Sequence, residues 1–187
     1  MDKKNFYKNY YEEYFRLIFS EDIETKFEDF KNLAIGVKSN ENKLIFAGNG
    51  ASASISSHGA VDFTKQAGVR SVTFSDSNLI TAFSNDYGYE KWITKALDFY
   101  ADNGDVVVLT SVSGESPNVV LAAKRAKEIG LKVVTFSGKS SNNSLQAIGD
   151  INFWVDSNAY NIVECIHMMW LTTVVDSVIG KSVYEVS

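Results

Sequence analysis

The chain has 187 residues, of which 45% are hydrophobic and 22% charged, a composition typical of a folded α/β domain with a well-buried core. The formal net charge of −5 at pH 7 argues against direct nucleic-acid binding and against a membrane-surface protein, although local dipoles can still hold one anionic small molecule. The single cysteine, Cys165, excludes an intrachain disulfide, the first residues lack the apolar region of a signal peptide, and no apolar run is long enough to span a bilayer, so we expect a cytoplasmic protein.

The first part of the chain, residues 5–38, predicts two helices rich in aromatic side chains. Tyrosine and phenylalanine recur at helical spacing between Tyr7 and Ile18, and Ser20-Glu21-Asp22 predicts a break with a helix cap. A second helix follows from Ile23. This aromatic stripe is too large for a surface, so we expect it to pack on the sheet and, in part, to form a subunit interface.

From residue 43 onward the pattern predicts a three-layer, doubly wound α/β fold, because strands and helices alternate. The strands are expected at 43–47, 69–74, 105–110, 132–137 and 150–155. The helices are expected at 53–67, 78–83, 87–101, 117–129, 140–147 and 160–179. We find no linker and expect a single domain over 1–187, in which 1–38 serve packing and oligomerisation and 43–187 form the core.

A serine-rich turn after the strand at 105–110 is the most informative motif. Ser111, Ser113 and Ser116 surround Gly114, and Pro117 stands near the first turn of the next helix. Such a turn directs N–H groups and hydroxyls at one point, and the helix dipole favours an anion there. Serines rather than lysines suggest neutral hydrogen-bond donors for a phosphate. The alternative is a serine-rich capping loop.

A second turn of the same kind follows the strand at 43–47. It contains Asn49, Gly50 and Ser52, and its glycines allow close approach of the backbone. Because both turns follow parallel strands, they open at the same edge of the sheet. The pair therefore favours a phosphate site more strongly than either turn does.

With these segments in place, the chain resembles the sugar isomerase (SIS) domain family, and within it the phosphoheptose isomerase branch. The resemblance covers nearly the whole chain and is carried by 47–52 (AGNGAS), His58, 84–90 (SNDYGYE), 104–108 (GDVVV), 111–119 (SVSGESPNV) and 122–133 (AAKRAKEIGLKV). It implies a five-stranded parallel sheet of flavodoxin-like order and a homotetramer with active sites shared between subunits.

The resemblance also implies a reaction and a phosphate site. The reaction is the aldose–ketose isomerisation of sedoheptulose 7-phosphate to a D-glycero-D-manno-heptose 7-phosphate, for the heptoses of lipopolysaccharide or capsule. The serines at Ser52, Ser111, Ser113 and Ser116 correspond to those that hold the sugar phosphate in the family. We add Asn49, Gly50, Asn85 and Asp86 as substrate-binding candidates, although Asp86 would also suit a helix N-cap.

The catalytic candidates are His58, Asp62 and Glu164. Isomerisation through an enediol needs a base that moves a proton between adjacent carbons. The family has a histidine and a glutamate one turn apart where this chain has His58 and Asp62, and the shorter aspartate changes the reach of the carboxylate.

The last predicted helix departs further from the family pattern. The family has a glutamine where this chain has Glu164, and a catalytic or metal-binding histidine where it has Thr172. A compensating site of His58, Asp62, Glu164 and His167 could hold a divalent metal such as Zn²⁺. The alternative is that His167 packs at a helix interface. We expect no nucleotide cofactor.

Two further functions remain open at this stage. The missing histidine would suit a non-catalytic SIS protein that binds a sugar phosphate or a protein partner, as a relative that binds the replication initiator does. An isomerase of another phosphosugar, with Glu164 as its base, is the third possibility. Cys165 is expected to be an inert buried thiol, because no basic residue flanks it.

Overall fold

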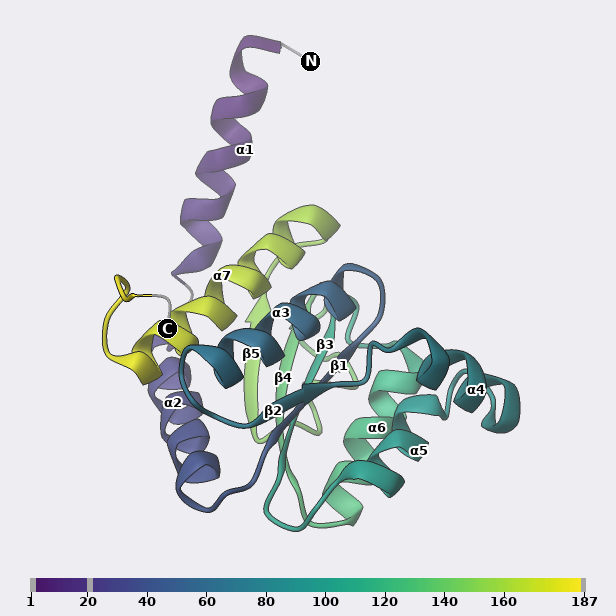
Figure 1. Cartoon of the computed structure of the whole chain (residues 1–187). Coiled ribbons are helices and arrows are strands. Elements are labelled where there is room, and N and C mark those ends of the chain that lie inside the picture. The colour runs from purple at the N-terminus through teal and green to yellow at the C-terminus, as the bar shows by residue number, and fades with distance from the viewer. Residues whose placement is uncertain (1–2, 20–21, 186–187) are drawn as a thin grey trace.

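In the computed structural model, which describes residues 3–19 and 22–185, five strands form one sheet in the order β2-β1-β3-β4-β5 (Figure 1). The strands are β1 (Leu44–Gly48), β2 (Ser71–Thr73), β3 (Val106–Ser111), β4 (Lys132–Gly138) and β5 (Ile151–Val155). Every neighbouring pair is parallel. This is the flavodoxin-like order, so the expected fold class is confirmed.

Seven helices are found in the described part of the chain, and most of them cover the two faces of the sheet. They are α1 (Lys3–Ile18), α2 (Ile23–Ser39), α3 (Ala51–Lys65), α4 (Ser77–Tyr87), α5 (Trp92–Tyr100), α6 (Pro117–Glu128) and α7 (Tyr160–Ile179). Helices α2, α3 and α7 share one core cluster with the sheet, and α5 and α6 share the other. The chain thus forms three layers.

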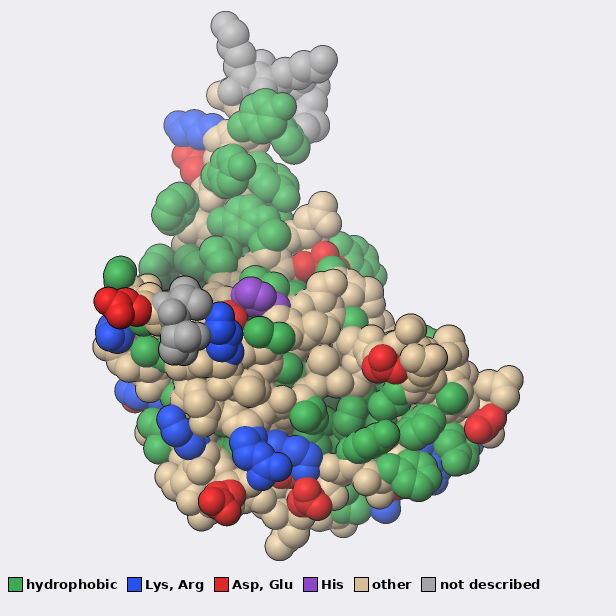
Figure 2. All heavy atoms as spheres, viewed as in Figure 1, with side chains coloured by type: hydrophobic (Ala, Val, Ile, Leu, Met, Phe, Trp, Pro, Cys, Tyr) green, Lys and Arg blue, Asp and Glu red, His purple; other side chains and the backbone are tan. Residues whose placement is uncertain are grey.

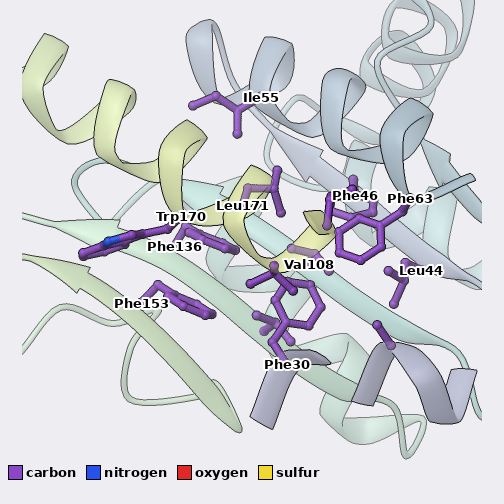
Figure 3. Packing of buried hydrophobic residues seen from close by; sticks show 14 of the residues in the cluster. Phe30, Leu44, Phe46, Ile55, Phe63, Val108, Phe136, Phe153, Trp170 and Leu171 are labelled. Carbon is purple, nitrogen blue, oxygen red and sulfur yellow. The ribbon is translucent and has the colours of Figure 1, made fainter. Parts of the chain in front are cut away.

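The strands belong to both clusters because alternate side chains point to opposite faces. In β1, Phe46 joins the cluster under α2, α3 and α7, whereas Ile45 joins the cluster under α5 and α6. Figure 3 shows the aromatic part of the first cluster, where the rings of Phe136 and Phe153 stack with centroids 4.5 Å apart. Burial on both faces explains why the strands appear in the sequence as nearly continuous apolar runs.

Helix α1 extends away from the body of the molecule (Figure 1). It contacts α7 rather than the sheet, and the Trp170 indole nitrogen donates to the Ile18 carbonyl oxygen at its base. Phe15 and Phe19 each leave 74% of their surface exposed, and Figure 2 shows hydrophobic side chains gathered along this helix. The expectation that the aromatic stripe packs on the sheet therefore holds for α2, which contacts β5, and is wrong for α1.

The link between α1 and α2 is only partly described, since Ser20 and Glu21 lie outside the described residues. Asp22 precedes α2 with φ of 65°, and its side chain makes no capping hydrogen bond. The expected cap at this residue is therefore not formed.

Two predicted helices differ from the structure. Residues 140–147 form turns, because the Asn143 amide nitrogen donates to the Ser140 carbonyl oxygen and its Oδ1 accepts from the Gln146 N–H. These local bonds compete with a helix. The expected helices 78–83 and 87–101 are divided differently, as α4 (Ser77–Tyr87) and α5 (Trp92–Tyr100). Asp76 caps α4, and Gly88 ends it with φ of 88°.

Among the described residues, α7 alone is long and apolar enough to cross a membrane by length and composition. The expectation that no apolar segment reaches this length is therefore wrong. Apolar residues of α7, namely Ile166, Trp170 and Val174, are buried in the hydrophobic core, which explains why this helix is so apolar. Such a helix is weak support for a membrane span.

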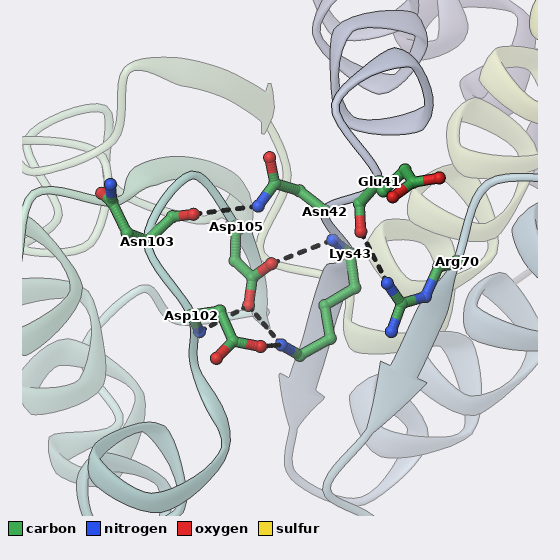
Figure 4. A network of polar contacts seen from close by, with 7 residues as sticks. All are labelled: Glu41, Asn42, Lys43, Arg70, Asp102, Asn103 and Asp105. Atoms are coloured by element: carbon green, nitrogen blue, oxygen red, sulfur yellow. Dashed lines mark hydrogen bonds and ion pairs between the residues drawn. The ribbon is translucent and has the colours of Figure 1, made fainter.

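A buried ion pair holds the amino ends of β1 and β3 together (Figure 4). The Lys43 ammonium lies 2.6 Å from carboxylate oxygens of both Asp105 and Asp102, and the Lys43 N–H donates to Asp105 at 2.9 Å. Burial lowers the pKa of Lys43, but the bonds to the two carboxylates outweigh it and raise that pKa. This network lies at the edge of the sheet opposite the two small-residue turns.

Candidate phosphate and catalytic site

The two predicted turns meet in one cavity of about 150 Å³ at the carboxyl ends of β1 and β3. Half of the sequence-predicted site residues line it, together with newly found neighbours. The lining residues are Asn49, Ser52, Thr110, Ser111, Val112, Ser113, Ser116, Tyr160 and Glu164. Thr110, Val112 and Tyr160 were missed from the sequence, because nothing in their residue types marks them.

Three helices begin at this cavity. Ser52 lies in the first turn of α3, Ser116 is the N-cap of α6, and Tyr160 is the first residue of α7. Helix N-termini carry partial positive charge and unpaired N–H groups, which favour an anion. The lining residues include no lysine or arginine, so the dipoles and hydroxyls supply the attraction.

Local geometry sets the serine hydroxyls close together. The Ser111 hydroxyl donates to the Ser116 hydroxyl at 3.1 Å, and the Glu115 N–H donates to Ser113 Oγ at 3.2 Å. Gly114 has φ of 66°, and a Cβ there would collide with the Asn143 side chain. Glycine is thus required for the turn to pass beneath the loop that follows β4.

The loop after β4 is fastened to the same turn. Glu115 accepts hydrogen bonds from the Ser144 hydroxyl and the Ser144 N–H, both at 2.7 Å. Both bonds lower the pKa of the Glu115 carboxyl, and the bond from the Ser144 hydroxyl has the larger effect.

Gly50 precedes α3 with φ of 56°. Its carbonyl oxygen accepts a hydrogen bond from the Ala53 N–H, but Gly50 is not among the residues that line the cavity.

An amide pair joins the two turns across the cavity. The Asn49 amide nitrogen donates to Asn118 Oδ1 and the Asn118 amide nitrogen donates to Asn49 Oδ1, each at 2.9 Å. The Tyr89 hydroxyl also donates to Asn49 Oδ1, at 3.2 Å. Sequence reasoning singled out neither Asn118 nor Tyr89, because their contacts depend on tertiary structure.

The expected pair of His58 and Asp62 is formed on α3. His58 Nε2 lies 3.1 Å from Asp62 Oδ2, and the two side chains are 52% and 21% exposed. The pair does not line the phosphate cavity, since it lies farther along α3 than Ser52. Tyr184 lies near Asp62 and Asp176. Its pKa is raised, mainly by loss of solvent contact and to a smaller extent by these two carboxylates. Tyr184 was not expected at this position.

His167 does not join the other candidates. It is fully buried, and its Nε2 lies 2.9 Å from the Ser137 carbonyl oxygen. The described residues contain no group of three or more His, Cys, Asp and Glu side chains that could hold a metal ion. The expected metal set of His58, Asp62, Glu164 and His167 is therefore not assembled within one chain.

We expect His167 to make the folded chain less stable as the pH falls from about 6.5 toward 4. Burial lowers the pKa of His167 to about 4, so below pH 6.5 the unfolded chain binds a proton that the folded chain does not. The loss should reach about 3 kcal/mol in full. Urea unfolding between pH 7 and pH 5 measures the first part of this loss, about 2 kcal/mol, above the range in which most carboxylates titrate.

The matched control is the other histidine of the chain. His58→Gln keeps the buried imidazole of His167 and should therefore still show the loss of stability. A free energy of unfolding that stays constant between pH 6.5 and 5 would contradict the assignment to His167.

Three further expectations are corrected or qualified by the structure. Asn85 and Asp86 are exposed in the last turn of α4, where the Asn85 amide donates to Asp86 Oδ1, and neither lines the cavity. Asp86 is therefore not a helix N-cap.

Cys165 is exposed rather than buried, and it lines an apolar cavity of about 550 Å³ between α1 and α7.

Comparison with known proteins agrees with this geometry. The SIS domain family matches residues 7–138, which is more than half of the chain. This chain belongs to the SIS domain family. It is 33% identical to a phosphoheptose isomerase of Fusobacterium nucleatum over 141 residues, which cover 73% of this chain and 72% of that protein.

Solved structures of this family have the same fold. The phosphoheptose isomerase of Neisseria gonorrhoeae superposes with a TM-score of 0.77 at 26% identity, covering 82% of this chain and 86% of that one. A phosphoheptose isomerase from Francisella tularensis gives a TM-score of 0.83 at 22% identity, covering 95% and 98%. At 22% identity, the similarity to the Francisella tularensis structure supports only the fold of this chain.

Proposed function

We propose that this SIS protein is a phosphoheptose isomerase that interconverts sedoheptulose 7-phosphate and D-glycero-D-manno-heptose 7-phosphate. The observation that carries the proposal is the serine-lined cavity at three helix N-termini, with a histidine–carboxylate pair on one of those helices. The named relatives support the same reaction. The product would serve heptose synthesis for lipopolysaccharide or capsule, in the cytoplasm.

The geometry suits a substrate with its phosphate and its reacting carbons at opposite ends. His58 lies six residues after Ser52 on α3, a rise of about 9 Å along the helix. A phosphate held at the serines thus lets the rest of a seven-carbon chain extend toward the His58–Asp62 pair. Glu164 is the one carboxylate among the residues that line the cavity itself.

Isomerisation moves one proton between adjacent carbons. A base removes the proton from the carbon next to the carbonyl while an acid protonates the carbonyl oxygen, which gives an enediol. A proton is then delivered to the former carbonyl carbon, while the neighbouring hydroxyl loses its proton and becomes the new carbonyl. His58 Nε2 and Asp62 Oδ2 lie 3.1 Å apart, so the two side chains can relay a proton between them. We assign these proton transfers to His58, Asp62 and Glu164.

The test is conversion of sedoheptulose 7-phosphate by the purified protein, with and without added zinc. Turnover supports the proposal. Binding without turnover under either condition would favour the non-catalytic SIS protein, because the Thr172 hydroxyl donates to the Met168 carbonyl oxygen and offers no proton relay. Turnover of another phosphosugar alone would favour the third function, with Glu164 as base.

We further propose that the protein forms a homotetramer. Helix α1 leaves Tyr11 62% and Phe15 74% exposed beside an apolar cavity of about 550 Å³, and exposed apolar surface of this extent is typical of an interface. Light scattering at micromolar concentration should give a mass about four times 20.7 kDa. A mass near 20.7 kDa would contradict this.

Phe15→Glu should reduce the mass, because it places a charge on the α1 surface. Phe99→Glu is the matched control, since Phe99 is similarly exposed, at 65%, but lies on α5. Equal effects of the two substitutions would argue against α1 as the interface.

A further inference from the structure

Tyr89 lies in the turn between α4 and α5 and reaches back to the turn that follows β1. Its hydroxyl donates to Asn49 Oδ1 at 3.2 Å, although 57% of the residue is exposed. Tyr89 belongs to neither core cluster, so packing does not explain why its side chain lies there. The contact with Asn49 is its one described hydrogen bond.

The hydrogen-bond capacity of Asn49 is almost fully used. Its Oδ1 accepts from both Asn118 and Tyr89, which occupies both lone pairs. Its Nδ2 donates one hydrogen to Asn118 Oδ1, and its second hydrogen has no partner among the described residues. Because Asn49 lines the phosphate cavity, this N–H is the group it can offer to a ligand.

The amide pair alone does not fix this orientation. If the Asn49 and Asn118 amides both turned by half a rotation, their two mutual hydrogen bonds would re-form with oxygen and nitrogen exchanged. Asn49 would then present an oxygen to the cavity, which repels an oxygen of a phosphate. In the second orientation the Tyr89 hydroxyl would have to accept from the amide nitrogen, and because a phenol donates a stronger hydrogen bond than it accepts, its bond to Oδ1 favours the first orientation.

We propose that Tyr89 is a positioning residue for the sugar-phosphate site: its hydroxyl holds the Asn49 amide with a free N–H available to an anionic oxygen of the ligand. This inference rests on the proposed function, because it assigns a role within the same cavity. Tyr89 does not touch the ligand in this scheme, and Asn49 and Asn118 transmit its effect.

Tyr89→Phe tests the proposal, because it removes the hydroxyl and leaves the ring. Calorimetry should show the affinity for sedoheptulose 7-phosphate weakened by about 3- to 10-fold, the range for one neutral hydrogen bond. KM should rise by a similar factor while kcat stays within about twofold, since the loss concerns binding and not proton transfer. Tyr87→Phe is the matched control and should change neither.

A double-mutant cycle separates positioning from a structural role. In the Asn49→Ala background, Tyr89→Phe should have no further effect on affinity, because Tyr89 acts through Asn49. Wild-type affinity in Tyr89→Phe, or an equal loss in both backgrounds, would overturn the proposal.

The same experiment distinguishes this inference from the proposed function. Calorimetry needs no turnover, so a wild-type protein that binds the sugar phosphate without converting it would reject the isomerase and still test Tyr89. A wild-type protein that binds neither this sugar phosphate nor inorganic phosphate would overturn both.

Discussion

His58→Gln should lower kcat for sedoheptulose 7-phosphate by about 10²- to 10⁴-fold and change KM much less. The reason is that proton transfer is felt in the transition state, whereas substrate binding depends mainly on the serine cavity. We propose that the imidazole is the proton carrier of the pair, since its Nε2 lies 3.1 Å from Asp62 Oδ2. The initial rate of sedoheptulose 7-phosphate conversion, measured over a range of substrate concentrations, gives kcat and KM.

The carboxylates complete this prediction. Asp62→Asn and Glu164→Gln should each lower kcat more than they raise KM, because amides keep the shape and lose the base. Glu24→Gln is the matched control, since Glu24 is exposed on α2 and does not line the cavity. Activity that survives Asp62→Asn and Glu164→Gln together would mean that the bases are elsewhere.

Ser111→Ala combined with Ser113→Ala should weaken sugar-phosphate binding by about 10²- to 10⁴-fold. Each lost hydrogen bond to a charged group costs about 1.5–3 kcal/mol, and every 1.4 kcal/mol is roughly tenfold in affinity. Both hydroxyls line the cavity where α6 begins, and Ser111 also orients the Ser116 hydroxyl at 3.1 Å. Calorimetric titration with sedoheptulose 7-phosphate gives the dissociation constants.

The control for this double variant is Ser177→Ala on α7. The Ser177 hydroxyl donates to the Val174 carbonyl oxygen and is not among the lining residues, so its loss should leave binding unchanged. If the double variant binds as tightly as the wild type, the phosphate does not bind at these serines.

The strands and both turns could be predicted from the sequence because their signals are local. A parallel strand buried on both faces is a short apolar run, and β3 (Val106–Ser111) lies within one residue of its expected range. The loop at 140–147 was predicted as a helix, because the bond from the Asn143 amide to Ser137 Oγ of β4 exists only in the folded protein.

The last helix shows the limit of periodicity for a site. Glu164 and His167 are three residues apart, so they point only about 60° apart around α7. That rotation is enough to leave Glu164 at the cavity and to bury His167 against the Ser137 carbonyl. Tyr89 could not be assigned at all, since its partner Asn49 lies 40 positions away in the sequence.

The Lys43–Asp105 ion pair has a consequence for how this fold can diversify. It clamps β1 and β3 at their amino ends, whereas the turns that surround the cavity leave the same strands at their carboxyl ends. Anchoring and recognition are thus separated by the length of the strands. Substitutions in the turns can change which sugar phosphate is accepted while the clamp remains intact. This separation allows one scaffold to acquire new specificities without losing its fold.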